Sequence, residues 1–146
     1  MRAAVLAGLT LVATVAVSFA EQAGSGLLGT WLTEDGSAQI RFEQCASTLC
    51  GRIVWLREPN DPETGKPALD KRNPDPGLRS RRLLGITIFT GIQPVQPHEW
   101  RAKAYNADDS KTYDVTLKLT PSDHLTLTGC GLFGLICKSE TWTRAR

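Results

Sequence analysis

Two arginines and three side chains of the Asp/Asn type stand close together in the chain, as Asp70, Asn73, Asp75, Arg79 and Arg81. A guanidinium fork suits a carboxylate or a phosphate, and the pattern therefore predicts an anion-binding site built from these five residues. The same residues support a structural alternative, in which Asp70 and Asp75 pair with Arg79 and Arg81 and hold their own loop in place. The residue types leave both interpretations open.

The charge of the chain is concentrated around these residues. The whole sequence is nearly balanced, with 17 Lys and Arg against 15 Asp and Glu, which argues against a general nucleic-acid binder. Between residues 71 and 82 the balance is +4, because five basic residues face the single acid Asp75. We expect residues 58–82, rich in proline, to form one long loop, which is typical of a functional segment or a cap.

Catalytic and metal motifs are absent from the sequence. It contains no Gly-x-Ser-x-Gly or His-Glu-x-x-His motif, and His98 and His124 are expected in turns rather than as general bases. The stretch 60–65 lacks the ligand pattern of an EF-hand and is expected to be a turn. We therefore expect no catalytic residue, no metal, no cofactor and no enzyme activity.

The four cysteines form two pairs that are close in sequence. Cys45 precedes Cys50, and Cys130 precedes Cys137. An even number of cysteines in an exported chain predicts disulfides, and of the three possible connectivities we favour Cys45–Cys50 and Cys130–Cys137, each across a hairpin.

The N-terminus has the features of a secretory signal. Met1-Arg2 is followed by an apolar run and by small residues at 18 and 20, which predicts a signal peptide over residues 1–20 and one domain over 21–146. A membrane anchor is the alternative, but the run is shorter than a spanning helix requires. The expected location is periplasmic or secreted, with no membrane span.

The rest of the chain has the pattern of short strands. Alternation is clearest over 112–120, where Tyr113, Val115, Leu117 and Leu119 share one face. The expected strands are 28–33, 38–45, 51–57, 83–90, 99–105, 112–120, 124–130 and 136–144, with a break at 93–97. This all-β pattern predicts an eight-stranded antiparallel up-and-down barrel. A β-sandwich is the alternative.

Gly29-Thr-Trp31 at the first expected strand looks like the start of lipocalin barrels, and this resemblance implies that the eight-stranded barrel is of the lipocalin/calycin type. The resemblance implies a structural role for Gly29, Trp31, Trp142 and Arg144, with Arg144 lying across Trp31; a plain core tryptophan is the alternative.

The wider pattern resembles the bacterial exported family catalogued as domain of unknown function 2147. The matching segments are 29–31, Asp70-x-x-Asn73-Pro-Asp75 with Leu78-Arg79-x-Arg81, 84–85, 105–108, 111–113, 127–129 and 141–144. Two departures are Arg82, where the family often has proline, and Asp109-Ser110, where a glycine turn is usual. The resemblance implies an envelope location and a small lipocalin-like barrel, and no established activity.

We therefore expect a monomeric exported barrel that binds a small amphipathic or anionic ligand at the mouth beside the loop. The interior could instead be filled by Ile40, Phe42, Val115, Leu117, Leu125 and Leu127. The alternative function is an interaction module that docks on an envelope protein, with Trp55 and Arg81 as anchors.

Overall fold

The structure is a computed structural model that describes residues 26–131 and 134–146. The predicted signal peptide, residues 1–20, lies outside the described residues. Among the described residues, no helix combines the length and the apolar character needed to cross a membrane.

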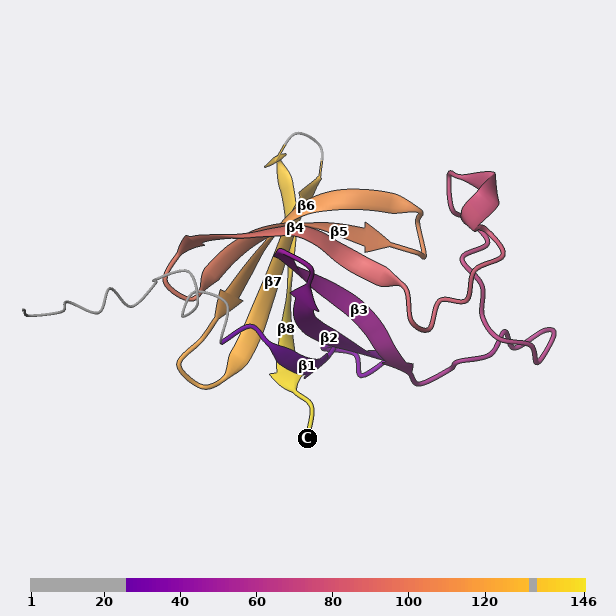
Figure 1. Cartoon of the computed structure of the whole chain (residues 1–146), viewed down its shortest axis with the longest axis horizontal. Coiled ribbons are helices and arrows are strands. Elements are labelled where there is room, and N and C mark those ends of the chain that lie inside the picture. The colour runs from indigo at the N-terminus through magenta and orange to yellow at the C-terminus, as the bar shows by residue number, and fades with distance from the viewer. Residues whose placement is uncertain (1–25, 132–133) are drawn as a thin grey trace, which may run out of the picture.

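Eight antiparallel strands form one closed barrel in sequence order, which confirms the predicted fold (Figure 1). The strands are β1 (Gly29–Leu32), β2 (Ala38–Cys45), β3 (Thr48–Leu56), β4 (Thr87–Gln96), β5 (Glu99–Asn106), β6 (Lys111–Leu119), β7 (His124–Gly131) and β8 (Ile136–Arg144). One 3₁₀ turn, η1 (Pro76–Leu78), lies in the long segment between β3 and β4.

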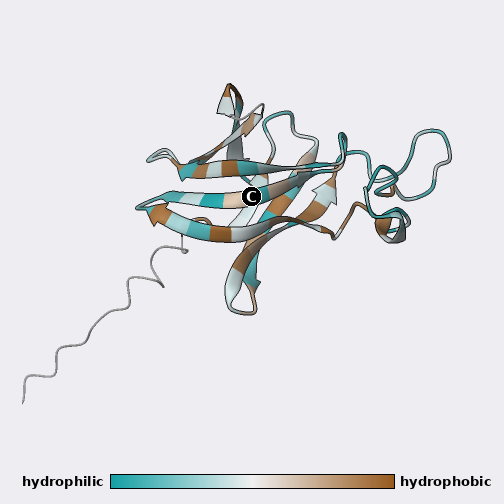
Figure 2. Ribbon diagram, turned by 90° about the horizontal axis from the view of Figure 1, so that it is seen from above, coloured by the Kyte–Doolittle hydropathy of each residue, from teal (hydrophilic) through white to brown (hydrophobic). Residues whose placement is uncertain are grey.

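The alternation of side chains explains why these strands close around a core. On β6, Val115 and Leu117 are buried while Asp114 and Lys118 are exposed, as a period of two requires. Hydrophilic and hydrophobic residues alternate along the strands in Figure 2. Five of the six predicted interior residues are buried, and Leu127 packs against them partly buried.

Aromatic side chains occupy the interior of the barrel. Phe89 stacks between Phe42, at 5.2 Å between ring centroids, and Trp142, at 5.8 Å. Gly51 makes this packing possible, because a Cβ there would lie 2.8 Å from the Phe42 ring and 2.9 Å from Phe89. Trp31 and Trp100 are also fully buried. The barrel core is therefore a packed one.

The fourth strand differs from its prediction. Residues 83–86 precede the strand, and β4 runs on to Gln96 through Pro94, where a break was expected. The register with β5 is irregular between Thr90 and Gln93 and between Pro94 and Gln96. Proline is tolerated in a strand at such a bulge, since no ladder hydrogen bond is required there. The prediction treated this proline as a strand breaker and was wrong.

The up-and-down order places the connections at two ends of the barrel. The turns after β1 and β5 and the long segment after β3 (residues 57–86) lie at one end, here called the loop end. Residues 26–28, the turns at 97–98 and 120–123 and the end of β8 lie at the other, here called the Arg144 end. Figure 1 shows the long segment extending away from the strands.

The two predicted disulfides are confirmed. Cys45 is bonded to Cys50 at the β2–β3 hairpin, and Cys130 to Cys137 across β7 and β8. Each closes a short loop, and each therefore restrains a hairpin rather than the whole barrel.

Candidate functional site

The long segment 57–86 has internal structure of its own. Isolated bridges join Asn60 to Pro67 and Leu69 to Arg82. The Asp70 N–H donates to the Arg81 carbonyl at 3.0 Å, and the Leu83 N–H donates to the Ala68 carbonyl at 2.9 Å. Because the two halves of the segment bond to one another, residues 57–86 are held as one folded unit at the loop end, here called the arm (Figure 1).

The centre of this arm is the buried carboxylate of Asp70, which is 1% exposed. Its Oδ2 accepts from Asn73 Nδ2 at 2.7 Å and from Arg81 Nη2 at 2.8 Å and Nε at 3.0 Å. Its Oδ1 accepts from the Tyr105 hydroxyl at 2.6 Å. Tyr105 lies at the end of β5, so this one carboxylate fastens the arm to the barrel rim.

The network shifts the pKa values of Asp70 and Tyr105. Burial raises the pKa of the Asp70 carboxyl, but hydrogen bonds from Tyr105, Asn73 and Arg81 outweigh burial and hold that pKa below its ordinary value. Burial, together with the adjacent Asp70 carboxylate, raises the pKa of the Tyr105 hydroxyl. Asp70 is therefore an anion paired with Arg81.

A second set of contacts shapes the tip of the arm. The Asp75 carboxylate accepts from the Gly77 N–H at 2.9 Å and caps η1, which has Pro76 at its start. Asn73 Oδ1 accepts from the Asp75 N–H at 2.9 Å, and Arg79 Nε donates to the Asn73 carbonyl at 2.8 Å. Asp75 and Asn73 thus fix the local backbone that carries Arg79.

The structure divides the five predicted site residues into two groups. It brings Asp70, Asn73 and Arg81 together in one satisfied network, which corresponds to the structural alternative for that part of the loop. Asp75 shapes the tip and makes no ion pair with either arginine among the described residues. Arg79 is exposed and uses only its Nε in the hydrogen bonds within the described chain.

Sequence reasoning missed two residues of this region. Tyr105 was read as part of a strand, although it is the group that ties the arm to the barrel. Arg82 was counted in the basic segment 71–82 and noted as a departure from a family pattern, but it was not among the predicted site residues. It is exposed, and within the described ranges its side chain has no hydrogen bond or ion pair. The local excess of positive charge was the signal that could have singled it out.

The Arg144 end is sealed by one side chain. The Arg144 guanidinium lies 4.1 Å from the centroid of the Trp31 ring. It donates to the carbonyls of Gly26 and Leu28 at 3.0 and 2.9 Å, and its Nε and Nη2 donate to the Asp123 carboxylate at 2.8 and 2.9 Å. These contacts close the barrel on the side away from the arm.

A surface hollow of about 320 Å³ at the Arg144 end brings His98 and Asp123 to one place. Asp123 is bonded to Arg144, and no hydrogen bond joins the side chains of His98 and Asp123 in the described chain. Near it, His124 Nδ1 lies 2.9 Å from the Ser122 carbonyl and 3.0 Å from the Ser122 hydroxyl. A carbonyl can only accept, so the contact with the Ser122 carbonyl is a hydrogen bond in the tautomer that has its proton on Nδ1.

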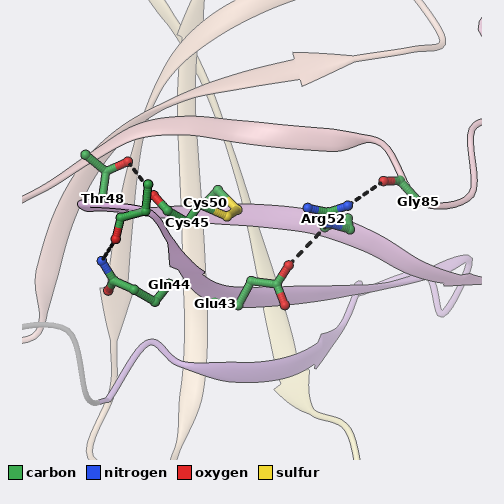
Figure 3. The surroundings of a disulfide bond; sticks show 8 residues. Glu43, Gln44, Cys45, Thr48, Cys50, Arg52 and Gly85 are labelled. Carbon is green, nitrogen blue, oxygen red and sulfur yellow. Dashed lines mark hydrogen bonds and ion pairs between the residues drawn. A yellow bond between two sulfur atoms is a disulfide. The ribbon is translucent and has the colours of Figure 1, made fainter.

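Figure 3 shows the surroundings of the Cys45–Cys50 disulfide. Glu43 and the two sulfurs lie close enough to be considered as metal ligands. The sulfurs are bonded to one another, however, and metal binding by cysteine needs free thiolates. Glu43 is paired with Arg52 instead, at 3.2 Å.

Comparison with known proteins identifies the fold. Residues 29–144 match the family described as "Uncharacterized protein conserved in bacteria (DUF2147)". The structure is similar to protein HP1028 from the human pathogen Helicobacter pylori, described as belonging to the lipocalin family, with a TM-score of 0.69 and 25% sequence identity. The match covers 82% of this chain and 83% of that one. No protein with a curated description matches the chain.

Proposed function

The chain belongs to the bacterial family DUF2147, and the family description names no activity. We propose, from the residues of the site, that the protein binds a small anionic amphiphile at the loop end. The observation that carries the proposal is that the arginines of the arm differ in pairing and exposure. Asp70 neutralises Arg81, while Arg79 and Arg82 stay exposed on the same folded arm.

The chemistry of the arm supports an anionic group as the ligand's head. Among the described residues, Arg79 uses one of its five N–H donors and Arg82 uses none, so both guanidinium groups can donate hydrogen bonds to a carboxylate or a phosphate. The Asp70 network holds the arm in place before binding, which lowers the entropic cost of recognition. A mobile loop of the same composition would bind more weakly.

Exposed apolar side chains near the arginines support an apolar tail. Leu78 is 37% exposed and directly precedes Arg79, and Leu84 is 45% exposed and lies two residues after Arg82. The tail would lie on this rim rather than deep in the barrel, because aromatic rings fill the core. The lipocalin-like fold is consistent with small-ligand binding. This analogy supports a small molecule as the ligand and does not identify it.

The experiment that tests this proposal is native mass spectrometry of the protein purified from its own source, followed by extraction of bound molecules. We expect an anionic amphiphile in the wild-type protein and its loss from an Arg79→Ala/Arg82→Ala variant. Recovery of the same molecule from both proteins would contradict the proposal.

An exposed tryptophan favours a second candidate, an interaction module for an envelope protein. Trp55 on β3 is 41% exposed, and aromatic anchors dominate many interfaces. Arg81, the other predicted anchor, is held by Asp70. A Trp55→Ala variant that loses a specific partner while keeping the amphiphile would favour this function.

Export is part of the proposal. Two disulfides are compatible with an extracytoplasmic protein, because such bonds persist in oxidising compartments. Cleavage after Ala20, measured by intact mass on protein from the periplasm or medium, is the expected result. A cytoplasmic protein that retains Met1 would contradict it.

A further inference from the structure

The ladder that closes the barrel covers only one part of β8. Between β1 and β8 the paired residues are Trp31 with Arg144 and Leu32 with Thr143. On its other side β8 is paired with β7 from Ile136 to Thr143. β1 is short and β8 long (Figure 1), so residues 136–141 of β8 form a strand edge beyond the end of β1.

The backbone groups at this edge can be assigned from alternation. The Thr141 N–H points to the β1 side, since it donates to the Glu34 carboxylate in the β1–β2 turn. Alternate residues of a strand present their N–H and C=O groups to the same side, so Ser139 and Cys137 present theirs there too. Glu34 covers the end of the edge at Thr141, and the ladder with β1 does not reach Ser139 or Cys137.

The side chains along this edge carry opposite charges two residues apart. Lys138 and Glu140 are both exposed and share one face of β8. Neither side chain has an ion pair among the described residues; the Glu140 carboxylate accepts only the Trp142 indole N–H, at 3.0 Å. Ser139, on the opposite face, shares a hydrogen bond with the Thr128 hydroxyl at 2.8 Å.

We propose that the protein forms a two-fold homodimer in which β8 pairs antiparallel with β8 of a second copy, centred on Ser139. This inference goes beyond ligand binding and replaces the monomer expected from the sequence. The centre makes Ser139 face Ser139 of the second copy as a hydrogen-bonded pair, and it places Cys137 opposite Thr141. This register pairs the odd-numbered residues 137, 139 and 141, whose N–H and C=O groups point away from β7.

Charge complementarity selects the second copy as the occupant. In this register Lys138 lies opposite Glu140 of the other chain, and the two-fold axis repeats that pair. A centre at Lys138 would instead set two lysines against each other, and like charges directly opposite destabilise a sheet. The edge is therefore complementary to itself. We expect a weak dimer, with micromolar or weaker affinity, because only the short edge of residues 137–141 pairs between the two copies.

Glu34 competes with the second copy for one end of the edge. Thr141 can pair with Cys137 of the other chain only after the Glu34 carboxylate leaves its N–H. Glu34 thus limits the dimer. Removing its side chain is expected to strengthen association.

The test is sedimentation velocity of the protein purified from its own source, over micromolar to millimolar concentrations. We expect concentration-dependent dimers that Lys138→Glu and Glu140→Lys each weaken roughly tenfold, because two attractive pairs become repulsive. The Lys138→Glu/Glu140→Lys double variant restores the dimer. Thermal melts establish that each variant is folded.

A backbone variant separates the ladder from the side chains. Ser139→Pro removes the central N–H, which faces away from β7, and is expected to abolish dimers. The control Ser139→Ala keeps the N–H and dimerises like the wild type. Glu34→Ala is expected to dimerise more tightly. A protein that stays monomeric throughout, dimers that ignore the charge reversals, or no gain from Glu34→Ala would overturn the proposal.

Discussion

The carboxylate of Asp70 and the guanidinium of Arg81 form a buried ion pair at 2.8 Å, with the carboxylate fully covered and the arginine side chain 33% exposed. The same carboxylate accepts from Tyr105 of β5. One acidic side chain therefore both closes the arm on itself and attaches it to the barrel. The arm is therefore held against the barrel rim, and it carries the exposed Arg79 and Arg82.

Replacing Asp70 should cost more stability than replacing any other acid of the arm. Asp70→Ala leaves Arg81, Asn73 and Tyr105 without their acceptor, and we expect the free energy of unfolding to fall by about 3 kcal/mol. Urea denaturation measures it. Asp75→Ala is the matched control, since it removes an exposed cap worth about 1 kcal/mol. Equal losses in the two variants would show that the buried network has no special role.

Acid should weaken the attachment of the arm. The folded protein holds the pKa of Asp70 below the ordinary value of 3.8, so the unfolded chain takes up this proton first on acidification. The stabilisation is complete above that value and is lost as pH falls through the folded-state pKa. The difference in unfolding free energy between wild type and Asp70→Asn should therefore shrink at acidic pH. A difference that stays constant down to pH 2, or grows there, would contradict the assignment.

The seal at the Arg144 end should depend on the guanidinium fork and not on charge alone. Arg144→Lys keeps the charge but cannot reach the Gly26 and Leu28 carbonyls and the Asp123 carboxylate at once. We expect a loss of about 2–3 kcal/mol and a change in tryptophan fluorescence, because Trp31 loses its cover. Arg146→Ala, at an exposed residue nearby, is the control. A lysine variant as stable as wild type would refute the role.

The disulfide between β7 and β8 should add modest stability. A Cys130→Ser/Cys137→Ser variant is expected to lose about 2 kcal/mol, because the bond closes only a short loop in the unfolded chain. Chemical denaturation with and without reductant measures it. The reductant should have no further effect at this hairpin in the double variant. A loss of all folded structure would mean that the bond does more than restrain a hairpin.

The barrel was predictable because its strands and hairpins are specified by residues that lie close together in the sequence. Alternation along β6 and the paired cysteines each identify a strand or a hairpin without long-range knowledge. β4 was misread because a bulge that accommodates Pro94 depends on its register with β5, which no local pattern contains. Local sequence rules therefore give the strands and miss their irregularities.

The site was predictable in composition but not in pairing. The residues around Asp70 and Arg79 were singled out by their chemical type, yet their partners lie in different parts of the fold. Tyr105 is 35 residues from Asp70 in the chain and meets it only after β5 joins the barrel. Only the folded structure shows which of these residues pair: Arg81 is bound to Asp70, while Arg79 uses only its Nε in the hydrogen bonds among the described residues.

The most direct test of the central claim is a calorimetric titration of the protein with decanoate and, separately, with its neutral amide. The account predicts saturable binding of the carboxylate, weaker binding of the amide, and a loss of roughly tenfold or more in affinity for decanoate in Arg79→Ala/Arg82→Ala, as expected when charge-assisted hydrogen bonds are removed. Arg146→Ala should bind as the wild type does. Equal affinity for the carboxylate and the amide, or a double variant that binds decanoate unchanged, would contradict it.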